Sequence, residues 1–266
     1  MMRIVILLFV FAVFTSCEEV VDIELNTSEP RLVIEANIIL LEDGTSNSTV
    51  KLTLTAPFFD NQIPEVDDAS VVITADNGMV YPFTYTNNGI YESSLLPQSD
   101  IKYVLEITYK GETYSATEQL VAGSNLEFVE QNNEGGFSGE EIELKAFFMD
   151  PPGQGDHYFF EGISERGLVL DTFFDEFFDG NLIFGLYRNE DLEAGDVVTF
   201  NLYGVNEQFY NFMFVLLQQS SDSGGGPFET QPATVRGNII NQTNIDNFPL
   251  GYFRVSEVST LIYTVE

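Results

Sequence analysis

The sequence predicts a mainly β protein, in which an immunoglobulin-like β-sandwich is followed by a second β-rich domain containing one amphipathic helix. Short runs rich in Val, Ile, Thr, Tyr and Phe alternate with turn signals through residues 30–122. Gly, Asn and Ser gather over residues 132–139, and strand patterns then resume. Apolar residues recur at helical spacing near residues 206–219.

The first region contains about seven short strand patterns within about 90 residues, the density expected of a β-sandwich. The clearest alternation places Val50, Leu52 and Leu54 on one face. Asn77-Gly78 and Asn88-Gly89 are hairpin-type turns. The antibody Cys and Trp are missing, so only the architecture is predicted. The expected strands are 31–38, 49–55, 70–75, 81–86, 90–93, 102–109 and 112–118.

We expect residues 123–139 to form a linker and residues 140–266 to form the second domain. Its first strand, 140–149, ends at tandem prolines, which cannot continue a sheet. Asn206 is a suitable N-cap for the helix, and Glu207 lies in its first turn. The other expected strands are 156–161, 168–170, 196–203, 252–258 and 261–265.

The N-terminal segment has the pattern of a lipoprotein signal peptide over residues 1–16. Arg3 precedes an uncharged apolar run that is too short to span a bilayer. Phe14-Thr15-Ser16-Cys17 resembles a bacterial lipobox, with Phe14 where Leu is usual. That resemblance implies a diacylglycerol and an N-acyl chain on Cys17, and therefore a palmitate-type lipid anchor. Cys17 is the only cysteine of the chain, so it has no disulfide partner.

Residues 17–29 then form a lipidated tether between this anchor and the first domain. Glu18 and Glu19 follow the cysteine directly. In lipoproteins of Bacteroidota-type bacteria, acidic residues at this place resemble an export signal to the outer face of the outer membrane; the alternative is that they are solvated linker charges. No later stretch is apolar enough to span a bilayer, so we expect attachment to the lipid bilayer through Cys17 alone.

The charge balance excludes one class of partner. Removing the leader takes away Arg3 and leaves nine basic against 42 acidic residues, a formal net charge of −33. Such a field repels phosphate backbones, so we expect no nucleic-acid binding. With 44% hydrophobic residues, including 24 Phe and 12 Tyr, the chain can still bury a substantial core.

The most unusual stretch is DTFFDEFFDG, which alternates aromatic pairs with acidic residues. On a helix it would present one aromatic and one acidic arc, formed by Phe173, Phe174, Phe177 and Phe178 and by Asp175, Glu176 and Asp179. A docked amphipathic helix and a partner or ligand surface both fit this pattern. Calcium binding is a third interpretation, with Asp171, Asp175, Glu176 and Asp179 as candidate ligands that lack EF-hand spacing.

The sequence offers no catalytic motif. His157 is the only histidine, and beside Tyr158 on a strand it is expected to be structural. Ser164 lies in GISER, which lacks the second glycine of a nucleophile elbow. Zinc sites draw on His and Cys, which are almost absent here. A carboxylate pair stays open as a glycosidase-like alternative, because 42 acidic residues make chance pairs inevitable.

Several stretches together resemble an uncharacterised Bacteroidota outer-membrane lipoprotein family, the domain of unknown function numbered 4249. They include EPRLVIEANI, DPPGQGDHYFF, FFDEFFDG, GPFETQPATVRGNI and LGYFRVSEV. The resemblance covers nearly the whole chain and implies a lipoprotein of two β-rich parts. Members of this kind are thought of as companions of TonB-dependent outer-membrane receptors.

These observations lead to a main hypothesis and to two alternatives. The main one is a lipid-anchored, surface-exposed binding or accessory lipoprotein that acts with a TonB-dependent receptor in ligand capture or uptake, without enzymatic activity and without a cofactor. The second is a calcium-stabilised adhesion or envelope scaffold protein. The third is a carboxylate-dependent hydrolase of the glycosidase type.

Overall fold

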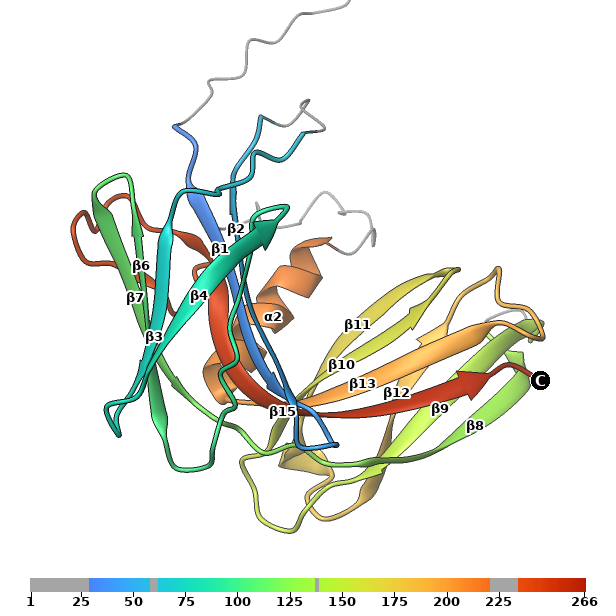
Figure 1. The fold of residues 1–266 in the computed structure, drawn as a ribbon. Coiled ribbons are helices and arrows are strands. Elements are labelled where there is room, and N and C mark those ends of the chain that lie inside the picture. The colour runs from blue at the N-terminus through green and yellow to red at the C-terminus, as the bar shows by residue number, and fades with distance from the viewer. Residues whose placement is uncertain (1–28, 58–61, 137–138, 221–233) are drawn as a thin grey trace, which may run out of the picture.

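The computed structural model describes residues 29–57, 62–136, 139–220 and 234–266. In these ranges the chain forms two β lobes that meet at a crease, and strand β15 runs through both (Figure 1). The predicted fold class is confirmed, since strands dominate and the described residues contain a single α-helix. The leader, Cys17, Glu18 and Glu19 lie outside the described residues.

The elements follow one another in this order along the chain. They are β1 (Leu32–Leu40), β2 (Ser46–Leu54), β3 (Ser70–Ala75), β4 (Val80–Asn87), β5 (Ile90–Glu92), β6 (Lys102–Tyr109), β7 (Glu112–Gln119), β8 (Leu126–Gly135), β9 (Glu141–Met149), β10 (His157–Ser164), β11 (Gly167–Phe174), the 3-10 turn η1 (Asp175–Phe177), β12 (Leu182–Arg188), β13 (Val197–Val205), α2 (Glu207–Ser220), β14 (Ile240–Asn241) and β15 (Leu250–Thr264).

The first lobe is a curled sheet around one apolar core. Its strands follow the order β15-β1-β2-β5-β4-β3-β6-β7-β14. In β6 the pattern is strictly alternating, and Tyr103, Leu105 and Ile107 are buried. The sheet curls back on itself, because Val121, just after β7, forms a parallel bridge to Ser256 on β15.

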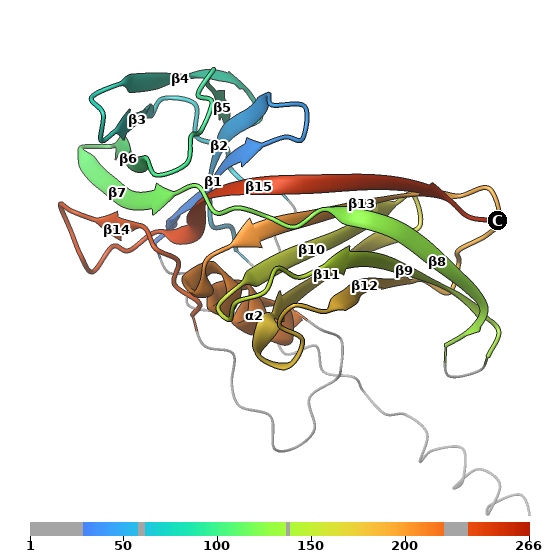
Figure 2. The ribbon, with the colours of Figure 1, turned by 90° about the horizontal axis from the view of Figure 1, so that it is seen from below.

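The second lobe is a two-layered sandwich (Figure 2). One layer contains β11, β10, β13 and the C-terminal half of β15, and the other contains β12, β9 and β8. Large aromatic side chains fill the space between the layers. Phe160 stacks on Phe200 with ring centroids 5.8 Å apart, and Phe148 contacts Tyr158 edge to face at 5.0 Å.

Strand β15 is shared between the lobes. Residues 250–257 pair in parallel with β1, and residues 258–264 pair antiparallel with β13. The first lobe therefore contains chain from both ends of the described sequence. The expected division at residue 140 is wrong in this respect, because a strand of 15 residues is long enough to pair with both lobes in succession.

The expected linker over residues 123–139 is also corrected. Residues 126–135 form strand β8, which pairs with β9 in a register interrupted by two irregularities. This edge strand is rich in Glu, Gln and Asn because much of it faces solvent, so its composition resembles that of a loop. The connection from one lobe to the next is limited here to the few residues between β7 and β8.

Helix α2 forms over the residues that the sequence predicted, and it lies at the crease. Asn206 caps it by accepting a hydrogen bond from the Phe209 backbone N–H at 2.8 Å. Phe209 and Met213 are buried in a separate apolar cluster with Ile39 of β1 and Phe159 of β10. The helix thus packs against residues of both lobes at once.

The crossing connection packs against β13 without space for a side chain between them. A Cβ atom at Gly204 would overlap the carbonyl oxygen of Ala122. Glycine is required at position 204 because the two backbones approach closely. Its conformation does not require glycine, since its φ is not in the left-handed region. Its neighbour Tyr203 pairs with Val258, where β15 passes from one lobe to the other.

We expect Gly204→Ala to destabilise the whole molecule by about 3 kcal/mol, because backbone atoms of the crossing connection must move to admit a methyl group. This corresponds to a fall of roughly 6–12 °C in a single calorimetric transition. The matched control is Thr264→Ala at an exposed position of β15, for which a change within about 0.5 kcal/mol is expected. Two separate transitions, with only one displaced, would show that the lobes unfold independently.

Candidate functional site

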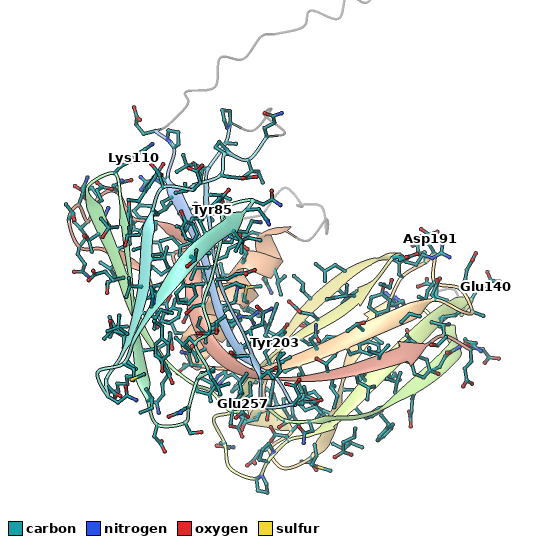
Figure 3. The ribbon with its side chains drawn as sticks, in the orientation of Figure 1. Tyr85, Lys110, Glu140, Asp191, Tyr203 and Glu257 are labelled. Carbon is teal, nitrogen blue, oxygen red and sulfur yellow. The ribbon has the colours of Figure 1, made fainter. Side chains whose placement is uncertain are left out.

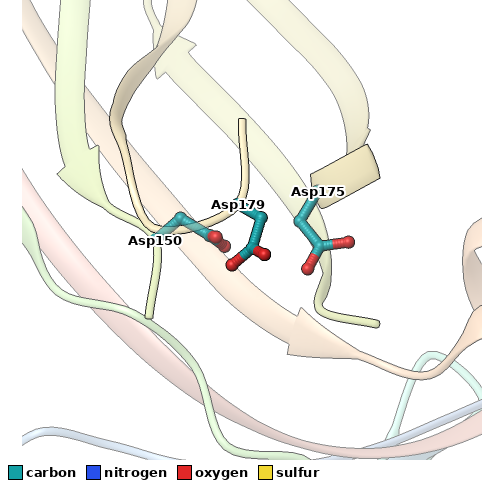
Figure 4. Close-up of side chains that lie close together, drawn as sticks. All are labelled: Asp150, Asp175 and Asp179. Carbon is teal, nitrogen blue, oxygen red and sulfur yellow. The ribbon is translucent and has the colours of Figure 1, made fainter. Parts of the chain in front are cut away.

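The ends of several second-lobe strands meet at one corner, which holds the carboxyl groups of Asp150, Asp156, Asp175 and Asp179. We call these residues the acidic corner. Asp150 follows β9, Asp156 precedes β10, and Asp175 and Asp179 follow β11. Carboxylate oxygens of Asp150, Asp175 and Asp179 lie within 4.8 Å of one another, and Figure 4 shows the three side chains converging.

Asp150 and Asp175 are buried, with 0% and 1% of their surfaces exposed. The Tyr158 hydroxyl donates to Asp150 Oδ1 at 2.7 Å, and the Gly180 backbone N–H donates to Oδ2 at 2.9 Å. Buried carboxylates require such donors, because an unpaired charge away from water is costly.

The loop between β9 and β10 closes over these carboxylates. Asp175 Oδ2 accepts hydrogen bonds from the backbone N–H groups of Gly155, at 2.8 Å, and Asp156, at 3.2 Å. Asp179 Oδ1 accepts from the Gly153 N–H at 2.7 Å. Gly153 and Gly155 adopt φ values of +128° and +120°, which only glycine adopts without strain. The carboxylates therefore hold this loop in place.

The charge of the corner is not compensated by basic side chains. Among the described residues, no ion pair involves any of its members. Burial raises the pKa of Asp156, and the negative charges of Asp150 and Asp175 raise it further, against a smaller opposing effect of His157. Such a site favours a proton, a metal cation or a cationic partner.

The neighbouring aromatic stretch is not the amphipathic helix considered from the sequence. Phe173 and Phe174 lie in β11, which pairs with β10 over its full length, and only Asp175–Phe177 form a 3-10 turn. Strand pairing with β10 provides a full ladder of backbone hydrogen bonds, which a short isolated helix could not match. Successive side chains therefore point to opposite faces instead of sharing one arc.

The four phenylalanines have different environments. Phe173 points into the second-lobe core, with its ring centroid 6.1 Å from those of Phe148 and Phe160. Phe178 packs against the same core. Phe174 points to the opposite face. Phe177 alone is almost fully exposed, at 88% of its surface.

On that outer face, Phe174 stacks with His157 at 5.6 Å and contacts Tyr210 of α2 at 5.8 Å. The His157 Nδ1 lies 2.9 Å from the Gly155 carbonyl oxygen. The histidine is thus part of the packing and of the loop's hydrogen bonding. Within the described ranges, no serine hydroxyl is hydrogen-bonded to its ring.

The structure separates the calcium candidates taken from the sequence. Asp175 and Asp179 belong to the acidic corner, whereas Asp171 and Glu176 are exposed and lie outside its converging carboxylates. Sequence reasoning missed Asp150 and Asp156, which are far from the aromatic stretch along the chain. The available signal was the DPPGQGD loop, in which two aspartates flank a turn rich in Pro and Gly.

The corner does not have the geometry of a glycosidase. A glycosidase places its two carboxyl groups on either side of a bond in an open cleft. Here Asp150 and Asp175 are buried and occupied by backbone and tyrosine donors. The arrangement suits the binding of a cation or the support of a surface better than acid–base chemistry on a sugar.

A family model described as a domain of unknown function (DUF4249) matches residues 18–262. The chain belongs to this family. The family's description assigns it no activity. No curated protein matches the chain.

Two solved structures are similar at low identity. A two fibronectin type-III domain segment from chicken tenascin is 12% identical with a TM-score of 0.21, and the match covers 67% of this chain and 92% of that segment. A cytokine receptor complex chain is 9% identical with a TM-score of 0.24, and the match covers 66% of this chain and 84% of that chain. In the ranges that the structure describes, no helix is long and apolar enough to cross a membrane.

The raised pKa of Asp156 predicts a pH-dependent effect of Asp156→Asn. A raised pKa means that ionisation of Asp156 costs stability, and this cost appears as the pH rises through the folded-state value. In the absence of divalent cations, the variant should be more stable than wild type at pH 7. The difference should vanish below the unfolded pKa of about 3.8. Urea midpoints at both pH values measure it.

Asp43→Asn provides a control, because its effect on stability at pH 7 should have the opposite sign to that of Asp156→Asn. A hydrogen bond from the Thr45 side chain lowers the pKa of Asp43, so its ionised form stabilises the fold above the unfolded pKa. This variant should lose stability at pH 7 and approach wild type as the pH falls through the folded-state value. If Asp156→Asn also lowers stability at pH 7, the repulsion inferred for the acidic corner is wrong.

Proposed function

We propose that the protein is a lipid-anchored, surface-exposed accessory lipoprotein of the outer membrane that acts with a TonB-dependent receptor in ligand capture or uptake. The lipobox at Cys17, the acidic residues Glu18 and Glu19 and the membership of the family support this assignment. The single structural observation behind a binding role is the exposure of Phe177, at 88%, beside the acidic corner.

Aromatic side chains, phenylalanine among them, are enriched in the buried centres of protein interfaces. The turn that carries Phe177 is fixed on both sides, because the backbone N–H groups of Phe178 and Asp179 donate to the Asp175 carbonyl oxygen at 3.0 and 2.9 Å. Such preorganisation lowers the entropic cost of binding. A partner would offer an apolar pocket for Phe177, bordered by basic groups that complement the nearby carboxylates.

The test is a gentle-detergent purification of the tagged protein from its own membrane, followed by mass spectrometry. We expect wild type to retain a barrel receptor in stoichiometric amount, and Phe177→Ser to retain at least tenfold less, since hot-spot truncation costs about 2 kcal/mol or more. Phe177 is not packed in a core, so the variant should keep its melting temperature.

The matched control is Ile262→Ser, which removes an apolar side chain that is 68% exposed on β15. It should retain the receptor. If a receptor is recovered equally with both variants, Phe177 is not the contact. If wild type recovers only background proteins, the partnership itself is wrong. Protease treatment of intact cells tests the orientation separately: an outward-facing protein is cleaved together with a known surface protein.

A second candidate function, a calcium-stabilised adhesion or scaffold protein, is favoured by the convergence of Asp150, Asp175 and Asp179. Calcium takes oxygen ligands at close quarters. Asp175 Oδ2 already accepts two hydrogen bonds, but Asp175 Oδ1 and the carboxylate oxygens of Asp150 and Asp179 accept at most one each and keep a lone pair for a cation. Backbone carbonyl groups or water would complete the coordination. The absence of a basic partner in the described residues leaves the negative charge available for a cation.

Under this second function, millimolar calcium should raise the melting temperature relative to chelator. At ten times the dissociation constant, the stabilisation is about 1.4 kcal/mol. Asp179→Asn should abolish this increment, because it removes a charged ligand but can still accept the hydrogen bond from Gly153. Glu176→Gln, an equal change of charge at an exposed neighbour, should keep it. An equal melting temperature of wild type in calcium and in chelator would exclude the site.

A further inference from the structure

A cavity of about 290 Å³ lies at the crease between the lobes, and its lining contains none of the acidic-corner residues. Parts of the chain that are distant in sequence form it: the β1–β2 turn, the crossing connection between β7 and β8, and the bend of β15 where it changes lobe. Figure 3 marks Glu257 at this crease. Ligand sites occur preferentially in clefts between such units.

Two carboxylates line the cavity, and each is held from one side only. The Ser259 hydroxyl donates to Glu42 Oε1 at 2.5 Å, and the Gly123 backbone N–H donates to Glu257 Oε2 at 3.3 Å. No Lys, Arg or His lines the cavity, and neither glutamate takes part in an ion pair among the described residues. The site thus combines fixed negative charge with unused acceptor capacity.

The remaining lining is neutral. Asn125 is exposed and offers an amide group, whereas the hydroxyl of Ser124 is already paired with Tyr158 at 3.2 Å. Leu40, Leu41 and Val258 contribute apolar surface. A net charge of −32 raises the local concentration of cations around the whole molecule.

We propose that this cavity binds a small organic cation, whose ammonium or guanidinium group is held by Glu42 and Glu257 while its hydrocarbon part contacts Val258 and the leucines. Charge-assisted hydrogen bonds to a carboxylate are the strong interactions available to such a ligand. A neutral amide and short apolar walls suit an aliphatic amine better than a hydrated metal ion. Such a cation would be the ligand of the capture role proposed above, and its binding to this cavity does not require the receptor.

Isothermal titration of the purified full chain with agmatine tests the site. We expect saturable binding with a stoichiometry near one. In the double variant Glu42→Gln and Glu257→Gln, affinity should fall at least tenfold. Both glutamines can keep the hydrogen bonds accepted from Ser259 and Gly123, so the variant should fold.

The strongly negative chain could also attract agmatine non-specifically, so the control has the same change of charge elsewhere. Glu92→Gln with Glu106→Gln alters exposed residues of β5 and β6 in the first lobe and should bind as wild type does. Asn125→Lys places a competing cation in the cavity and should also suppress binding. No saturable binding by wild type, or an equal loss of affinity in the control pair, would overturn the proposal.

Discussion

The shared pairing of β15 is the constraint on which the rest of the structure depends. Its first half completes the sheet of the first lobe beside β1, and its second half completes a layer of the second lobe beside β13. Domains joined by ordinary linkers move relative to each other by default. Here a change of lobe angle would have to break ladder hydrogen bonds in at least one sheet. The crease cavity and the position of α2 follow from this continuous backbone.

Arg254 reinforces the same junction with a single side chain. Its Nε donates to Asn37 of β1 at 2.6 Å, while its guanidinium lies 4.3 Å from the ring centroid of Tyr203 on β13. The rings of Phe209 and Phe159 lie at 5.1 and 5.4 Å. A cation over aromatic faces is stabilised most when it is shielded from water. The Arg254 guanidinium therefore contacts the first lobe, the second lobe and helix α2 at the same time.

Local sequence patterns predicted the elements whose conformation depends on neighbouring residues, namely most strands and helix α2. Alternation located most strands, and the Asn206 cap with its apolar repeat located α2, because these signals act within a few residues. Strand β8 was missed since an exposed edge strand has the composition of a loop. The Phe173–Phe178 stretch was misread because pairing with β10, not helical spacing, decides its conformation. Asp150 joins Asp175 only through the fold, and no local pattern could have grouped them.

The position of β15 in the chain also determines the order of assembly. Asn37 and Arg254, which are hydrogen-bonded, are separated by 217 residues. Contacts of such long range form slowly, since a large loop must close before they contribute. All other described strands are synthesised before β15. Until β15 is made, the first lobe has an unpaired edge at β1 and the second lobe has one at β13. A chain that stops before residue 250 therefore lacks a strand in both lobes and leaves the edges of β1 and β13 unpaired at the same time.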